Sequence, residues 1–122
     1  MSYSTLPHLR SNAASQAQTA APTKAAGAAA GTSPTIAVTG SDESGVVSIT
    51  AGTSPATGTL VTLTFQKPYA VAPTAFVVEN DSQATQLGVY CTVSTTALTI
   101  KCRTAGTQSD VYLINYLLVG GA

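Results

Sequence analysis

The sequence predicts one small all-β domain, a β-sandwich or a jelly-roll-like domain with an extended N-terminal arm. Three observations support this prediction. The chain has 122 residues, which is enough for one domain. Thr and Val are abundant, and their β-branched side chains favour strands. From Thr35 onward, short apolar runs alternate with turn signals rich in Gly, Pro, Asn and Asp.

We predict that residues 1–33 form a flexible arm and that residues 34–122 form the β domain. Ser11 to Gly31 is mostly Ala with Ser, Gln, Thr and Gly, and it has no apolar periodicity that would give a helix a face to bury. Only one part of the arm combines large apolar side chains with a positive charge, and we expect it to be an anchor peptide on a tether. It consists of Leu6, Pro7, His8, Leu9 and Arg10.

The β domain is expected to begin with three strands separated by turns. The first two, Thr35–Thr39 and Val46–Ala51, flank the turn Gly40–Gly45, which has Gly at both ends and Asx chemistry inside. A loop over Gly52–Gly58 then leads to the third strand, Leu60–Gln66. A fourth strand is predicted after the following Pro-containing connection, over Ala75–Glu79.

A pentapeptide nearly recurs in this region. Gly31-Thr32-Ser33-Pro34-Thr35 matches Gly52-Thr53-Ser54-Pro55-Ala56 except at the last residue. The flanking residues do not match well enough to predict a repeat architecture. We interpret the recurrence as reuse of the same turn chemistry.

Leu87–Arg103 shows the clearest period-two pattern of the chain and predicts a hairpin with Cys91 and Cys102 on its apolar face. A turn at Thr96-Ala97 would place the cysteines directly opposite each other, about 5 Å apart between Cα atoms. A turn at Thr95-Thr96 fits the pattern equally well and pairs Cys91 with Ile100. A cytosolic origin favours free buried thiols over a disulfide, and two cysteines make no zinc site without further ligands.

The last predicted strand, Val111–Val119, is apolar on both faces and must therefore be covered twice. In so small a domain, we expect the second cover to be another subunit. A chain with no Trp and two Phe buries limited apolar area, and oligomerisation is the usual remedy. The expected subunit interface consists of Tyr112, Ile114, Tyr116, Leu117 and Leu118.

Charge and hydropathy exclude several classes of protein. Charged residues make up 8% of the chain, against roughly 25% in an ordinary soluble domain, and five basic residues balance five acidic ones. Such a chain lacks the electrostatic footprint of a nucleic-acid binder or a polybasic membrane-surface protein. No segment approaches the roughly 20 apolar residues of a membrane span, and no secretory signal is visible. We expect a soluble chain made in a cytosol, with no nucleic-acid or membrane partner.

Catalysis needs titratable groups that converge, and the sequence does not predict such a group. His8 is the only His and lies in the arm, away from a rigid mounting for a general base. Paired acids could bind calcium or cleave glycosides, but we interpret the acids of this chain as solvated turn residues. They are Asp42, Glu43, Glu79, Asp81 and Asp110. We therefore expect no enzyme activity, no metal and no cofactor.

Tyrosines offer one possible binding surface, since Tyr is enriched where proteins bind partners. A sugar platform could be built from them, but core or interface packing is the favoured interpretation. The tyrosines concerned are Tyr69, Tyr90, Tyr112 and Tyr116.

Five motifs of the β domain carry a resemblance: Gly40–Gly45, Gly52–Phe65, Lys67-Pro68-Tyr69, Ala72-Pro73 and Tyr112–Tyr116. Through them, about two thirds of the chain resembles a β domain of tailed-bacteriophage virion proteins, found in capsid decorations, head fibres and tail-fibre tips. The resemblance implies a trimeric β structure on virions without catalysis. It supplies no binding residues.

A short arm before one β domain, with no repetitive shaft, suits a protein attached directly to a shell. The leading interpretation is a capsid decoration or head-fibre protein, made in the host cytoplasm and carried on the virion. Its arm binds the major capsid protein or another virion protein, and its β domain forms a homotrimer. The alternative is the receptor- or glycan-binding tip of a tail fibre or a similar adhesin.

Overall fold

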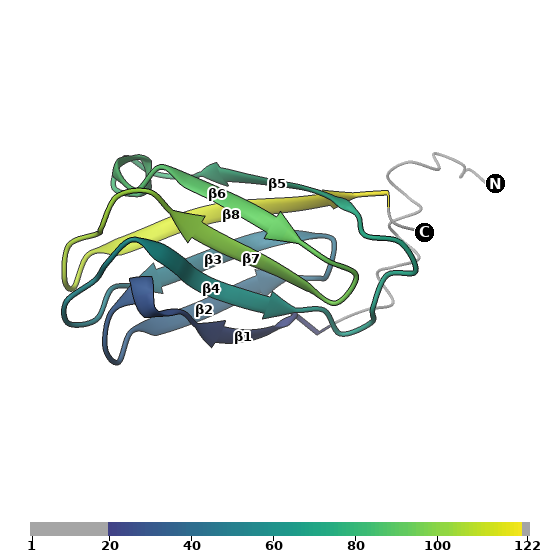
Figure 1. The fold of residues 1–122 in the computed structure, drawn as a ribbon, viewed down its shortest axis with the longest axis horizontal. Helices are drawn as coiled ribbons and strands as arrows, with labels where there is room; N and C mark the ends of the chain where they lie inside the picture. The colour runs from purple at the N-terminus through teal and green to yellow at the C-terminus, as the bar shows by residue number, and fades with distance from the viewer. Residues whose placement is uncertain (1–19, 121–122) are drawn as a thin grey trace.

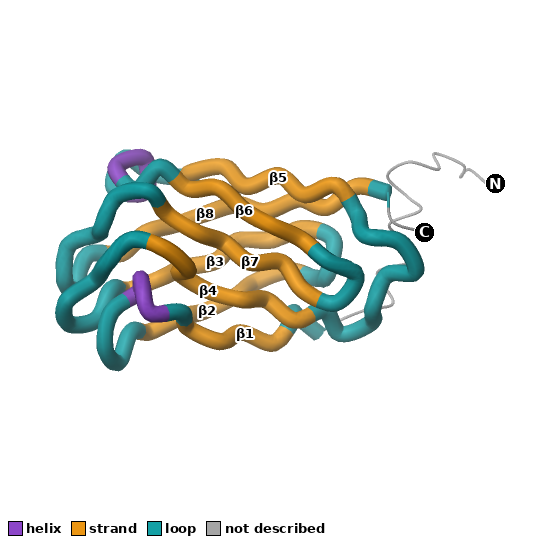
Figure 2. Tube along the Cα trace, viewed as in Figure 1, coloured by secondary structure: helices purple, strands orange, loops and turns teal. Residues whose placement is uncertain are grey.

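A computed structural model describes residues 20–120 and shows a β-sandwich of two antiparallel four-stranded sheets (Figure 1). The predicted all-β sandwich is thereby confirmed. The first sheet has the order β1-β4-β7-β6 and the second the order β2-β3-β8-β5. Apart from the strands, the described chain has two short 3-10 helices, η1 and η2, and connecting loops (Figure 2).

Every predicted strand is present within a few residues of its expected position, and the last one, Val111–Val119, has the predicted bounds. The first strand of the structure was not predicted. The first sheet consists of β1 (Thr23–Ala26), β4 (Gly58–Thr64), β7 (Ala97–Cys102) and β6 (Val89–Val93). The second consists of β2 (Thr35–Gly40), β3 (Ser44–Thr50), β8 (Val111–Val119) and β5 (Thr74–Glu79). The helices are η1 (Ala28–Ala30) and η2 (Ala84–Gln86).

The core lies between the two sheets. Alternate residues of most strands point inward, because successive side chains of a strand project to opposite faces. In β4 the pairing with β7 shifts between Thr59 and Val61, and the consecutive residues Leu60 and Val61 are both buried. Burial of these apolar side chains holds the sheets together at roughly 25 cal/mol for each Å² removed from water. The strand residues at most 3% exposed in this layer are Val47, Ile49, Leu60, Val61, Leu63, Leu98, Ile100, Cys102, Tyr112, Ile114 and Tyr116.

The β6–β7 hairpin turns at Thr95-Thr96, the second of the two registers that fit the sequence. Ser94 donates its backbone N–H to the carbonyl of Ala97 at 2.9 Å, which closes the two-residue turn. In this register Cys91 lies opposite Ile100, and Cys102 lies opposite Val89. Both cysteines are free.

The β domain begins before residue 34, where the sequence placed its boundary. β1 pairs with the edge of β4, and Ala29 and Ala30 of η1 are buried. Gly27 permits this packing, because a Cβ there would lie 2.2 Å from the carbonyl oxygen of Thr59. Every side chain of β1 is exposed, so the strand shows no period-two pattern, and its contribution is made through backbone hydrogen bonds. Residues 20–33 are therefore part of the sandwich.

β1 begins and β8 ends at the same end of the sandwich (Figure 1). The β2–β3 turn, the β4–β5 connection and the β6–β7 turn lie at this end too. Among residues 20–120, no helix is long and apolar enough to cross a membrane.

Candidate interaction surface

The second sheet has an outer face without charge. Registry between its strands shows which residues point away from the core. No charged side chain occupies any of these outward positions, and most of the side chains are small hydroxyls or aliphatic groups. We call this surface the charge-free face. It consists of Thr35, Ala37, Thr39, Ser44, Val46, Ser48, Thr50, Thr74, Phe76, Val78, Val111, Leu113, Asn115, Leu117 and Val119.

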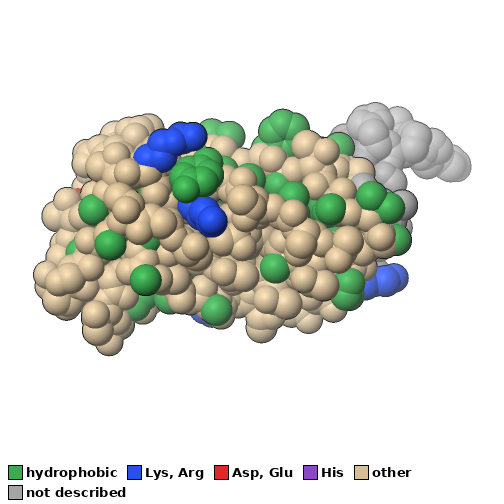
Figure 3. Space-filling view, in the orientation of Figure 1, with side chains coloured by type: hydrophobic (Ala, Val, Ile, Leu, Met, Phe, Trp, Pro, Cys, Tyr) green, Lys and Arg blue, Asp and Glu red, His purple; other side chains and the backbone are tan. Residues whose placement is uncertain are grey.

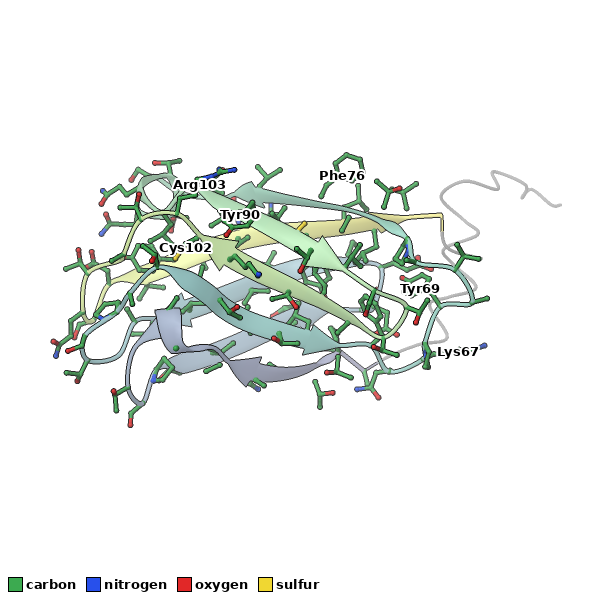
Figure 4. The ribbon with its side chains drawn as sticks, in the orientation of Figure 1. Lys67, Tyr69, Phe76, Tyr90, Cys102 and Arg103 are labelled. Carbon is green, nitrogen blue, oxygen red and sulfur yellow. The ribbon has the colours of Figure 1, made fainter. Side chains whose placement is uncertain are left out.

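The β5 and β8 part of this face is apolar and exposed. Phe76 lies directly opposite Leu117, and these side chains are 51% and 48% exposed. Val78 and Val119 flank the pair and are 57% and 51% exposed. We call these four residues the apolar patch; the Phe76 side chain extends from β5 away from the sandwich (Figure 4). Contiguous exposed apolar side chains of this kind mark surfaces that other molecules cover.

Only one of the expected interface residues lies on this surface. Tyr112, Ile114, Tyr116 and Leu118 are at most 6% exposed, because they face the opposite sheet of the same chain. They have no surface left for another subunit, so the assignment of these four is corrected. Leu117 points outward and can contact a partner. The other strand face expected to be covered, which includes Val111 and Val119, is the one that the chain leaves open.

The expected anchor peptide, residues 6–10, lies outside the described residues. Its role stays a prediction.

Asp42 is buried rather than solvated, which corrects its interpretation as a turn acid. The side chain is 3% exposed, and its two carboxylate oxygens accept the backbone N–H groups of Gln66 at 2.9 Å and Lys67 at 3.0 Å. Tyr69 donates its hydroxyl to the carbonyl of Asp42 at 3.2 Å. The β2–β3 turn is thereby tied to the start of the β4–β5 connection. We call this arrangement the Asp42 lock.

Tyr116 joins the same end of the sandwich from β8. Its hydroxyl donates to the carbonyl of Ser41 at 2.6 Å. Gly45 leaves room for this bond, because a Cβ there would lie 2.7 Å from the Tyr116 hydroxyl. Burial is the largest cause that raises the pKa of Tyr116 above 10.0, and Asp42 adds to it. Burial likewise raises the pKa of Tyr69 to about 12, with Glu43 and Asp42 as further causes.

Three of the other four acids also serve local structure. Asp81 accepts the backbone N–H of Ala84 at 2.8 Å, at the start of η2. Asp110 accepts from the side-chain amide of Gln83 at 3.3 Å. Glu79 accepts the backbone N–H of Val89 at 3.3 Å. Within the part of the chain that the structure describes, no group of three His, Cys, Asp or Glu side chains could hold a metal ion.

The cysteines have the environment of unreactive thiols. Cys102 is buried and its Sγ lies 3.5 Å from the carbonyl oxygen of Ala56, while the half-buried Cys91 lies 3.9 Å from that of Ala75. Burial raises the pKa of both thiols. The thiolate is the reactive form, so both side chains are poor nucleophiles at neutral pH.

The tyrosines do not gather into one platform. Tyr112 and Tyr116 lie in the core, and Tyr69 packs its ring edge-on against Phe65 with ring centroids 4.9 Å apart. Tyr90 differs from these because it projects from the outer face of the first sheet, beside Arg103 (Figure 4).

Comparison of the chain with models of protein families, with curated proteins and with solved structures finds no match. Its function is therefore inferred from its own surfaces.

Proposed function

We propose that this chain is a non-enzymatic structural protein of a bacteriophage virion, a capsid decoration or head-fibre protein. Its β domain forms a homotrimer, and its N-terminal arm attaches the trimer to the major capsid protein. The observation that carries the proposal is the charge-free face with its apolar patch on β5 and β8.

The charge-free face favours another copy of the same chain as the partner. In a ring of copies each subunit is buried against its neighbours, and a charged group left there without a partner is costly. A face without charges avoids that cost at any rotation of one copy against the next. Burial of Phe76, Val78, Leu117 and Val119 would then remove apolar area from water. The number of copies, three, comes from the resemblance to phage virion domains.

Three of the five motifs that carry the resemblance meet at one end of the sandwich, which supports treating these three as one structural unit. Gly40–Gly45 holds Asp42, and Lys67-Pro68-Tyr69 supplies the groups that bind it. Tyr116, from Tyr112–Tyr116, binds the same turn. These motif residues stabilise the end of the sandwich where the described chain begins. Because these residues are used within the fold, we assign attachment to the capsid to the N-terminal arm.

Self-association is tested by placing a charge in the apolar patch. Wild-type protein is expected to sediment as a species of three times the 12.2 kDa chain mass. Leu117→Asp is expected to be a folded monomer, because its side chain is exposed in one chain and would be an unpaired buried carboxylate in the trimer. Thr64→Asp adds the same charge at an exposed outward position of β4 and should remain trimeric. A wild-type chain that stays a folded monomer at micromolar concentration would refute this part of the proposal.

Attachment is tested by deleting residues 1–19, which leaves every described strand intact. The shortened protein is expected to remain a folded trimer and to lose binding to purified capsids. Binding is measured by co-sedimentation with capsids, and bound copies are located on the particle by electron microscopy. Full occupancy by the shortened protein would place the attachment site in the β domain and overturn the role of the arm.

A further inference from the structure

A basic and aromatic cluster lies on the outer face of the first sheet, opposite the charge-free face. Tyr90 of β6 is directly cross-strand from Lys101 of β7. The guanidinium carbon of Arg103 lies 4.8 Å from the centre of the Tyr90 ring. In Figure 3 two Lys or Arg side chains flank a hydrophobic one on this face, and Figure 4 labels Tyr90 and Arg103 there. We call Tyr90, Lys101 and Arg103 the basic cluster.

Backbone hydrogen bonds fix the position of Arg103 in the chain. Arg103 donates its backbone N–H to the carbonyls of Leu87 at 3.0 Å and Gly88 at 3.2 Å, just beyond the end of β7. Its side chain then stacks on Tyr90, which is an attractive arrangement for a guanidinium and an aromatic ring. A guanidinium over a ring retains N–H groups that can bind an anion in a bidentate manner.

Among the described residues, no outward strand position of this sheet carries an acid that could neutralise the two cations. The outward positions of the four strands are Thr, Ala, Tyr and Lys, with no acid among them. Glu79 belongs to β5 of the other sheet, and its carboxylate accepts the backbone N–H of Val89. Two of the few positive charges of this chain thus stand together beside a ring, on a surface otherwise made of neutral side chains.

The residues around the basic cluster favour a saccharide as the ligand that carries the anionic group. Thr59 lies cross-strand from Lys101 on its other side, and Thr92 and Thr99 form the next outward pair of the hairpin. Threonine hydroxyls both donate and accept hydrogen bonds, as sugar hydroxyls do. Two cations are few for a nucleic acid, whose binding relies on neutralising many phosphates. One carboxylate on a sugar ring matches two cations and an aromatic side chain.

We propose that the basic cluster binds the carboxylate of an acidic saccharide, with Arg103 as the bidentate partner, Lys101 as a second positive charge and Tyr90 as the support that orients the guanidinium. The ligand class is a carbohydrate built of uronic or other carboxylate sugars. This site is separate from the charge-free face, so it does not depend on the proposed assembly. It suits the alternative role of a receptor- or glycan-binding protein, and it is equally compatible with a shell protein that binds a host surface.

The test uses the full chain and short alginate oligosaccharides, which carry carboxylates and no sulfate or phosphate. Calorimetric titration is expected to show saturable binding of alginate and none of neutral dextran oligosaccharides. Arg103→Gln and Lys101→Gln should each weaken alginate binding about tenfold or more, since each removes a charge-assisted bond. Arg103→Lys should also weaken it, because a lysine keeps the charge but loses the bidentate geometry. Lys24→Gln is the matched control, since it removes one exposed charge from β1 of the same sheet, and it should bind as wild type.

Three results would overturn the proposal. The first is no alginate binding by the wild-type chain at millimolar oligosaccharide. The second is equal weakening by Lys24→Gln and Arg103→Gln, which would indicate nonspecific charge attraction. The third is binding of poly-glutamate as strong as that of alginate, which would assign the cluster to acidic peptides. Sedimentation of the same variants reports assembly separately, so loss of saccharide binding and loss of the trimer are distinguishable.

Discussion

At the scale of single residues, the largest difference between sequence and structure is Asp42. A turn rich in Ser, Asp, Glu and Gly is normally solvated, yet this carboxylate is buried and accepts two backbone N–H groups more than twenty residues away. A buried carboxylate with both oxygens bonded is a strong constraint, because removing one bond leaves a buried charged group short of a partner.

Asp42→Asn is expected to destabilise the fold by about 2 kcal/mol, the scale of a lost hydrogen bond to a charged group. The amide keeps one acceptor oxygen and turns its NH₂ group toward the second backbone N–H. Urea denaturation measures the difference. Glu43→Gln is the control next in sequence, and it should leave the free energy of unfolding within about 0.5 kcal/mol of wild type. Equal stability of the two variants would contradict the Asp42 lock.

Alkaline pH should destabilise the protein through Tyr69 and Tyr116, whose hydroxyls donate to backbone carbonyls of the β2–β3 turn. An unfolded tyrosine ionises near pH 10, whereas the folded pKa of Tyr69 is about 12 and that of Tyr116 is also raised. Between these values the unfolded state binds fewer protons, so stability is complete below about pH 10 and falls as pH rises toward about 12.

Urea midpoints measured at about pH 9, 10.5 and 11.5 are expected to fall along this series. The Tyr69→Phe, Tyr116→Phe double variant should show a shallower fall, although it starts less stable because it lacks two hydrogen bonds. Between about pH 6 and 9 both tyrosines stay protonated in the folded and unfolded states, so they should not change the urea midpoint of the wild type there. This range is the reference. A double variant with the same slope as wild type would show that other groups control the alkaline transition.

At the scale of elements, the two nearly identical pentapeptides pair with each other. Thr32 and Thr53 form an antiparallel bridge with N–H···O distances of 2.8 and 3.0 Å. The serines that follow them, Ser33 and Ser54, have φ values of 57° and 58°. The serine of each copy thus adopts the same left-handed φ, whereas the preceding glycine does so only at Gly31. The shared serine conformation agrees with the interpretation of reused turn chemistry. The pairing of the pentapeptides connects the start of β2 to the end of β3.

Truncation separates β1 and η1 from the residues before them. Deletion of residues 1–19 is expected to leave the melting temperature unchanged, because the sandwich keeps all eight strands. Deletion of residues 1–30 removes β1 from the edge of β4 and the bonds that Ala29 and Ala30 accept from Ala56 and Gly52. We expect the longer deletion to lower the melting temperature by more than about 5 °C, as a loss of about 1 kcal/mol does in a domain of this size.

Thermal unfolding followed by circular dichroism measures both deletions. Equal melting temperatures of the two shortened proteins would mean that residues 20–30 do not stabilise the sandwich. The stable domain would then begin near residue 34, as the sequence predicted.

At the scale of the whole molecule, the two sheets present different surfaces. The outer face of the second sheet carries no charge and ends in the apolar patch, whereas that of the first carries Tyr90, Lys101 and Arg103 among threonines. One sandwich can thus use one face for assembly and the other for a ligand.

Assembly through the charge-free face should depend little on salt. Salt screens attraction between exposed charges over about 10 Å at 0.1 M, and this face has none to screen. The dissociation constant of the trimer is expected to change less than about threefold between about 0.05 M and 0.5 M NaCl, and sulfate should tighten it by strengthening apolar burial. Sedimentation equilibrium measures both effects. Weakening of more than about tenfold in NaCl would mean that charged residues make the interface instead.

The sequence by itself determined the local features of this protein. Period-two alternation predicted the bounds of Val111–Val119 and divided its residues correctly between two faces, because alternation is a property of the strand alone. Turn chemistry likewise placed the connection at Gly40–Gly45. Only the tertiary structure decided which face of β8 its own chain covers. Coverage depends on where distant strands pack, and the larger aromatic side chains, Tyr112 and Tyr116, filled the space between the sheets while Leu117 stayed outside.

The same reason accounts for the contacts that the sequence could not predict. Asp42 meets the backbone of Gln66, β1 pairs with β4, and Arg103 stacks on Tyr90 because the folded chain brings these segments together. Backbone partners and exposed strands such as β1 have no side-chain pattern, so they leave no signal in the sequence. Local periodicity can be read from consecutive residues of one strand. Which strands pair, and which strand faces are buried, depends on how all strands pack together.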